Sequence, residues 1–173
     1  MSEQQNATNH EGLKEMYEKF KAPFPPEAYQ ADTSRGFELT TVKAQYVVER
    51  LNDVMNFHNW RIEGKYDKQE NGSVLFEGQL VLFLGDYLGT AGRDSAVHII
   101  PTVGYSDKKK NIGDAYKGAR TDALSKAASY LGIANDVFKG LVGTGGTKKA
   151  TKATNKKPAS FQGKKATKVS GDF

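Results

Sequence analysis

Alternation between apolar and polar residues is the strongest structural signal along this chain. Residues 60–66 place large apolar side chains between charged ones, Trp60, Ile62 and Tyr66 against Arg61, Glu63 and Lys65, the period of a half-buried strand. A long apolar run follows at residues 74–84, after Asn71-Gly72, a pair that tolerates the positive φ angles of a tight hairpin turn. A third run, residues 96–105, contains Pro101, which lacks a ladder donor and predicts an edge strand or a bulge. The pattern therefore predicts three consecutive strands.

Helical spacing occurs on both sides of these strands. Residues 11–21 carry one apolar stripe and end before a group of prolines, which cannot continue a helix. Residues 42–55 carry a second stripe, and Thr40 or Thr41 is expected to cap that helix. The two stripes consist of Leu13, Met16, Tyr17 and Phe20, and of Val47, Leu51, Val54 and Met55.

The last predicted helix, residues 112–133, has a broad face rich in alanine. At about 100° per residue, this face comprises Ile112, Ala115, Tyr116, Ala119, Ala123, Ala127, Tyr130 and Leu131. Small residues let a helix lie close to a sheet. We expect an α+β fold in which a three-stranded antiparallel sheet packs against this long C-terminal helix, with further helices at the N-terminal side. Arg120 and Lys126 fall inside or at the rim of the face, which marks them as candidate functional residues.

Composition divides the chain into three parts. A length of 173 residues with 38% hydrophobic content supports one modest core, which we expect over residues 23–140 after a helical segment at 1–22. Residues 141–173 are basic and poor in large apolar side chains, so we predict a disordered tail there. The formal net charge of +5 comes from this tail. A basic surface on the folded part must therefore be a local concentration.

Signals for catalysis are weak throughout the sequence. The chain has no cysteine, which excludes disulfides, thiolate metal sites and cysteine nucleophiles. The three histidines lack the spacing of metal ligands on a helix, and residues 140–149 lack the lysine position and the strand-to-helix context of a phosphate loop. We expect no catalytic site, cofactor or metal; a magnesium nuclease using Asp107 or Asp122 is the remaining enzyme alternative.

Targeting and membrane signals are also missing from the sequence. No apolar run approaches the roughly 20 residues of a membrane helix, and the first residues have no signal-peptide pattern. We therefore expect a cytoplasmic protein, not secreted and without a membrane partner.

Cations and aromatic residues are interleaved in the part expected to fold. Lys108–Lys110 lies in the turn before the last helix, and Lys117, Arg120 and Lys126 follow on it. If the helix crosses the sheet, these charges are expected to converge with Arg61 and Lys65 on one side. Single-stranded nucleic acid is bound by backbone cations and by stacking on aromatic rings, here Trp60, Tyr66, Tyr87 and Tyr105. A solvated loop and buried aromatics are the structural alternative.

Three segments carry a resemblance to a known family. They are Pro23–Glu27 (PFPPE), Tyr46–Trp60 (YVVERLNDVMNFHNW), and Gly104-Tyr105 through Thr121-Asp122-Ala123-Leu124 to Leu131-Gly132. In this order they resemble the Rad fifty-two-like single-strand annealing proteins, in the short branch found in bacteria and phages. The resemblance covers roughly residues 20–135.

This resemblance implies a protomer that assembles into rings or open spirals and holds single-stranded DNA in an outer basic groove. Lys126 matches a DNA-contacting position of the family, and Lys108–Lys110 occupies a loop where relatives carry lysine. Arg35 matches an arginine upstream of the second helix. Ser125 and Ser129 stand where relatives carry further cations, which puts the strength of binding in doubt.

We therefore expect an ATP-independent protein that binds single-stranded DNA and anneals complementary strands in homologous recombination and DNA repair. Its expected partners are single-stranded DNA and further copies of itself, with a single-stranded DNA-binding protein or a recombinase as an open alternative. The α-β-β-β-α order also fits a double-stranded RNA-binding module, and a purely structural assembly protein is a further alternative. The expected DNA-binding residues are Lys126, Arg120, Lys117, Lys108, Lys109, Lys110, Arg61, Lys65 and Arg35.

Overall fold

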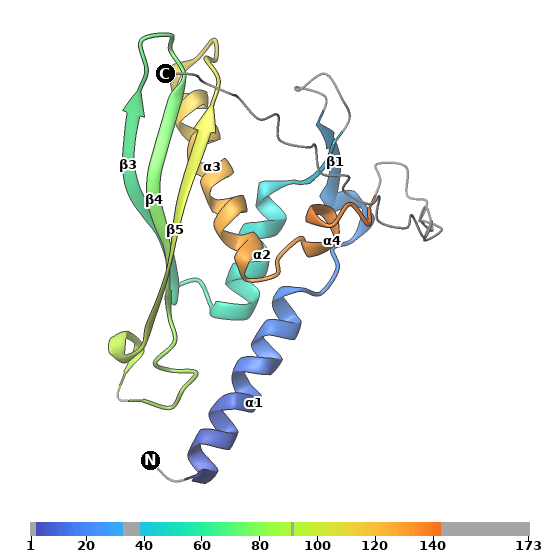
Figure 1. The fold of residues 1–173 in the computed structure, drawn as a ribbon, viewed down its shortest axis with the longest axis vertical. Helices are drawn as coiled ribbons and strands as arrows, with labels where there is room; N and C mark the ends of the chain where they lie inside the picture. Colours follow the sequence, from blue (N-terminus) through green and yellow to red (C-terminus); the bar gives the residue numbers. More distant parts are fainter. Residues whose placement is uncertain (1–2, 33–38, 91, 143–173) are drawn as a thin grey trace, which may run out of the picture.

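Three long strands form one antiparallel sheet in the computed structural model, which describes residues 3–32, 39–90 and 92–142 (Figure 1). The strands are β3 (Trp60–Lys68), β4 (Val74–Phe83) and β5 (Val97–Ser106), and β4 lies in the centre. The predicted α+β class and the three-stranded antiparallel sheet are confirmed. Pro101 lies on β5, an edge strand of this sheet, as its missing donor requires.

The turn between β3 and β4 differs from the prediction in its backbone conformation. Gly72 has a φ of 85°, whereas Asn71 has no positive φ. Instead the Asn71 side chain closes the turn, because its Oδ1 accepts hydrogen bonds from the backbone nitrogen and the hydroxyl of Ser73 at 2.9 and 2.7 Å. The predicted pair of positive φ angles is therefore wrong, and one glycine together with a side-chain bond is sufficient.

Helix α3 (Ile112–Tyr130) lies across one face of the sheet, against β4 and β5 (Figure 1). The contact is close because all but one of the buried residues of α3 are alanines. They are Ala115, Ala119, Ala123, Ala127 and Ala128, and the exception is Leu124. A Cβ atom at Gly104 of β5 would overlap the Ala119 carbonyl oxygen and lie 2.8 Å from the Ala123 Cβ.

The buried face of α3 is not the one predicted at either end. Ile112 is 42% exposed and Tyr130 is 77% exposed, whereas Leu124 and Ala128 are buried. Both mispredicted residues lie in the terminal turns of the helix, and the buried arc extends further in the middle because α2 also contacts α3.

The remaining helices lie on the same side of the sheet as α3 (Figure 1). Helix α1 (Glu3–Phe20) begins before the predicted residue 11, and of its predicted stripe only Met16 and Phe20 are buried. Helix α2 (Ala44–Met55) buries its whole predicted stripe. The short 3-10 helices η1 (Pro26–Ala28) and η2 (Arg93–Ser95) precede β1 and β5.

A two-stranded sheet and a short helix were not predicted from the sequence. Strands β1 (Tyr29–Asp32) and β2 (Leu39–Val42) pair antiparallel, so Thr40 and Thr41 belong to a strand and do not cap α2. The residue before α2 is Lys43, whose side chain makes no capping bond. Helix α4 (Asn135–Phe138) follows α3.

Two further predictions concern membrane helices and the residues outside the described ranges. Among the described residues, no helix has the length and apolar character needed to cross a bilayer. Arg35 and residues 143–173, which make up most of the predicted tail, lie outside the described part of the chain.

Candidate nucleic-acid interface

The two faces of the sheet separate the predicted cations into groups. Cross-strand partners point to the same face, and the Thr102 hydroxyl of β5 donates to the Ala123 carbonyl of α3 at 2.8 Å. Even-numbered residues of β5 and their partners therefore face the helix. Arg61 pairs with Val81, and Val81 with Ile99, so Arg61 lies on the opposite, outer face.

Lys65 lies on the same outer face as Arg61, because the two are four residues apart on β3 and every second residue of a strand points to the same face. The predicted convergence of Arg61 and Lys65 with the α3 cations is therefore wrong. The buried side chain of Ile62 already faces the helix side, and strand alternation then directs its charged neighbours away from it.

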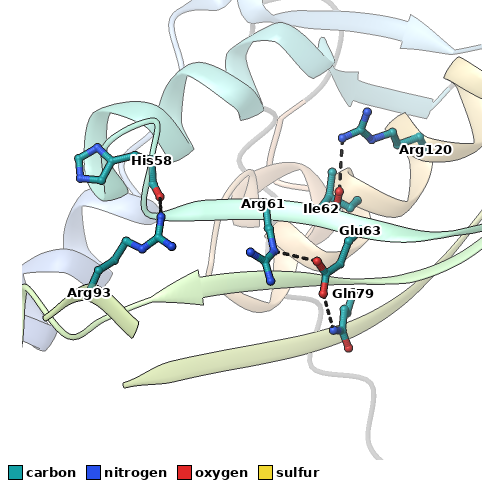
Figure 2. Close-up of polar contacts among 7 residues, drawn as sticks. All are labelled: His58, Arg61, Ile62, Glu63, Gln79, Arg93 and Arg120. Carbon is teal, nitrogen blue, oxygen red and sulfur yellow. Dashed lines mark hydrogen bonds and ion pairs between the residues drawn. The ribbon is translucent and has the colours of Figure 1, made fainter. Parts of the chain in front are cut away.

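Two arginines on the outer side of the sheet, Arg61 and Arg93, donate hydrogen bonds to other residues of the chain (Figure 2). Arg61 Nε donates to Glu63 Oε2 at 2.7 Å, and Gln79 donates to the other Glu63 oxygen at 2.9 Å. The hydrogen bond from Gln79, and then the charge of Arg61, hold the pKa of Glu63 below its usual value. Arg93 donates to the His58 carbonyl at 3.0 Å and, like Arg61, lies over the Phe83 ring.

Arg120 reaches the free edge of β3. Its Nη2 lies 3.3 Å from the Ile62 carbonyl oxygen (Figure 2). A carbonyl of an edge strand that points away from the neighbouring strand has no partner in the sheet. The guanidinium of Arg120 thus has a structural contact, while the side chain stays at the surface.

Lys126 and Asp122 lie at the other edge of the sheet, beside β5. The Lys126 ammonium is 2.7 Å from Asp122 Oδ2, and the same oxygen accepts the backbone N–H of Tyr105 at 2.9 Å. Half of the Lys126 side chain is exposed. Because exposed ion pairs are weak, Lys126 remains able to exchange Asp122 for another anion.

Two hollows in the surface meet at Lys126. The first, of about 340 Å³, lies between the β5 edge and the end of α3 and is lined by Pro101, Thr102, Val103, Lys126, Ser129 and Tyr130. The second, of about 480 Å³, lies between β2, α3 and α4. Lys126 lines both hollows, and Ser125 lines the second. Of the predicted cations in the described part of the chain, Lys126 is the one that lines these hollows.

The other predicted cations lie nearer the opposite end of α3. The Lys108 side chain approaches Gly72 in the β3–β4 turn, and Lys108–Lys110 are all exposed. Lys117 precedes Lys126 by nine residues, which places it roughly 13 Å away along the helix axis and on the opposite side of the helix. The lysines of this end therefore do not form one cluster with Lys126.

All four predicted stacking aromatics make contacts within the described chain, and Tyr105 makes its own through its hydroxyl and Asp107. Trp60 Nε1 donates to Asn52 Oδ1 at 2.9 Å, and the Tyr87 hydroxyl donates to the Val54 carbonyl at 2.6 Å. Tyr66 packs edge to face against Phe76 and Tyr116. Tyr105 is 46% exposed, but it lies on the outer face of the sheet.

Two aromatic residues at the hollows were not assigned to a site by the sequence analysis: Tyr130 at the first hollow and Phe138 at the second. Tyr130 is the one that lies beside Lys126 on α3. It lines the 340 Å³ hollow with Lys126, four residues earlier on α3. Residues four apart on a helix are neighbours, so this spacing was the available signal. Arg93 was also missed, and its position in a glycine-rich loop gave no signal.

Comparisons and metal-site geometry add little to the assignment. In the described ranges, no group of three or more histidine, cysteine, aspartate or glutamate residues is arranged to hold a metal ion. Asp107 accepts a hydrogen bond from the Tyr105 hydroxyl, and Asp122 accepts one from the Lys126 ammonium.

A scan against protein-family models and a search of curated proteins gave no match to this chain. The family resemblance therefore remains a prediction.

Proposed function

We propose that this protein binds single-stranded DNA and anneals complementary strands without ATP, in homologous recombination or DNA repair. One observation carries the proposal: the half-exposed Lys126 stands between two surface hollows and beside the exposed ring of Tyr130. A cation next to an accessible aromatic ring is the combination that binds single strands. The resemblance of residues 104–132 to the annealing family, in which Lys126 matches a DNA-contacting position, supports the same conclusion.

Annealing requires that the protein bind phosphates and leave base edges free for pairing. The described cations suit moderate, salt-dependent binding, because many of them are offset by neighbouring acids such as Asp122 and Glu63. The basic residues beyond position 143 add a further attraction for polyanions that is independent of sequence.

We further propose that the protein acts as a homo-oligomeric ring or spiral. This is supported by a row of apolar side chains on the outer face of β5, where Val97, Ile99, Val103 and Tyr105 are 46–49% exposed. Contiguous exposed apolar surface marks sites of association. A repeated protomer would join the single Lys126 sites into a longer track for DNA.

A double-stranded RNA-binding module is the second candidate. The element order α2-β3-β4-β5-α3 favours it, because such modules share this order. The two candidates differ in the ligand, since that module recognises an A-form duplex and the annealing protein recognises an unpaired strand.

The proposal is tested by titrating the full chain into a labelled single-stranded oligonucleotide over a series of salt concentrations. We expect log affinity to fall with log salt by about 0.7 per phosphate contacted. The Lys126→Ala variant should bind several-fold more weakly, and its log–log salt slope should be shallower by about 0.7, the value for one phosphate contact. Lys19→Ala is the matched control, because Lys19 also forms a 2.7 Å ion pair four residues away, on α1.

Three outcomes would contradict the proposal. Unchanged affinity and slope in Lys126→Ala would remove that residue from the site, and stronger competition by duplex RNA would favour the second candidate. For the assembly, light scattering should give a mass of several protomers that Ile99→Glu reduces. A wild-type protein of single-chain mass, with and without DNA, would contradict the ring.

A further inference from the structure

We propose that the 340 Å³ hollow at the β5 edge, called the groove below, is a nucleobase subsite. An unpaired base stacks there on Tyr130 while Lys126 contacts the phosphate of the same nucleotide. This inference rests on the proposed function and names the part of the ligand that the groove binds. The Tyr130 ring is its base-contacting group.

The groove has the size and the chemical mixture of a small-ligand site. Its volume of about 340 Å³ lies at the lower end of the range of such pockets. One wall is the backbone edge of Pro101–Val103, and the other is formed by Lys126, Ser129 and Tyr130 of α3. Apolar surface from Pro101, Val103 and the Tyr130 ring can cover the faces of a planar base, and the lysine gives the groove one positive group.

Tyr130 differs from the other tyrosines in the described part of the chain. It is the most exposed of them, at 77%. Tyr66 and Tyr116 pack against each other, and Tyr17 has the Lys21 ammonium over its ring. The Tyr130 side chain has no such ring or cation contact among the described residues. Its ring face is therefore accessible for stacking.

A peptide strand is a poor alternative occupant of this groove. Strand addition needs a row of free backbone donors along the edge. Pro101 has no N–H, and the Tyr105 N–H, which points away from β4, is already bonded to Asp122. Among residues 101–105, the alternation of a strand then leaves Val103 as the outward donor. A base stacked on Tyr130 does not need this row of donors.

The subsite is tested by comparing a thymidine oligonucleotide with an abasic oligonucleotide of the same length and charge. The variants are Tyr130→Ala, Tyr130→Phe and, as a control, Phe57→Ala, an exposed aromatic residue outside the groove. Tyr130→Ala should lose about tenfold in affinity for the thymidine strand, as expected for one stacked base, and nothing for the abasic strand. Tyr130→Phe and Phe57→Ala should bind both strands as the wild type does.

Each contrary result has a distinct meaning. Equal losses on both strands, or no loss on either, would overturn the subsite while single-strand binding by the wild type upholds the proposed function. A wild-type protein that binds neither strand would overturn both. If Tyr130→Ala keeps its DNA affinities but has a lower mass in light scattering, the groove contacts a second copy of the chain instead, and the base subsite is wrong.

Discussion

Ile99 and Ile100 are neighbours on β5, yet the first is 49% exposed on the outer face and the second is 7% exposed against the helices. On the helix side, alanines of α3 lie directly against the strands. On the outer face, β4 separates a row of apolar residues on β5 from the charged residues of β3, and no α-helix of the described residues covers that row (Figure 1). One face thus completes its packing within a single chain, whereas the other has the composition of a surface that binds a partner.

Gly104→Ala should have the largest effect on the covered face. The added Cβ would overlap backbone atoms of Ala119 and Ala123, which cannot move independently of the helix. We expect a loss of more than about 3 kcal/mol in the free energy of unfolding, at or above the upper part of the range for overpacked cores. Urea denaturation followed by Trp60 fluorescence measures it.

Gly12→Ala is the control for this change, because a Cβ at Gly12 on α1 would have no neighbour within 4 Å. It should stabilise the protein by up to about 1 kcal/mol. Equal stabilities for the two variants would mean that α3 does not pack against β5 as described.

The Ile99 and Ile100 pair compares the two faces at adjacent positions. Ile100→Ala should cost about 2 to 3 kcal/mol, through lost burial and the cavity left behind. Ile99→Ala should cost less than about 1 kcal/mol, because half of that side chain is already in water. These values apply to the protein at concentrations at which it is monomeric, measured by denaturation. A larger cost at Ile99 would reverse the assignment of the faces.

On the helix side of the sheet, a hydrogen bond between β1 and α4 contributes to the free energy of unfolding, and this contribution depends on pH. The Tyr29 hydroxyl on β1 donates to Asp136 Oδ2 on α4 at 2.5 Å. Burial, and then the bond to Asp136, raise the pKa of Tyr29 from about 10 to about 12. The folded state therefore favours the protonated phenol, so this contribution is complete below about pH 10 and is lost as the pH rises toward 12.

Tyr29→Phe tests this contact. The variant should be less stable than the wild type by about 1 kcal/mol below pH 10, and the difference should disappear or reverse near pH 12. Unfolding free energies at a series of alkaline pH values show this. A difference that does not change with pH would mean that the hydroxyl is not bonded to Asp136.

Asp122→Asn should have the smallest effect on stability. The amide oxygen can still accept the Tyr105 N–H, and the lost ion pair with Lys126 is exposed, so we expect a change of less than about 1 kcal/mol. Affinity for single-stranded DNA should rise several-fold, because Lys126 no longer has a competing carboxylate. Lower affinity with unchanged stability would show that Asp122 positions Lys126 for binding.

The main elements of the fold were predictable because their signals are local. The alternation at residues 60–66 lies within β3, and the apolar stripe at residues 47–55 lies within α2. The structure confirms the strand and the helix that these two patterns predict. Strands β1 and β2 have four residues each, too few to show a period. The cap by Thr40 or Thr41 was predicted wrongly because both residues belong to β2, which pairs with β1. The Asn71 conformation was predicted wrongly because its side-chain bond to Ser73 closes the turn. Neither outcome follows from residue type.

The candidate site was predictable only in part. Lys126 was found because a charged residue at the rim of an alanine face is unusual. Tyr130 was assigned to the buried face because a helical period gives the direction of a side chain, not the point at which the helix extends beyond its neighbours. Arg61 was expected beside Lys126 although its alternation with Ile62 places it on the outer face.

The most direct test of the account is the annealing rate itself. Two complementary oligonucleotides carrying a donor and an acceptor dye are mixed with the full chain in the absence of ATP. We expect the wild type and the Lys19→Ala control to accelerate pairing, and Lys126→Ala to lose most of the acceleration. A wild-type rate no higher than that of the DNA alone, or an undiminished rate in Lys126→Ala, would contradict the central claim.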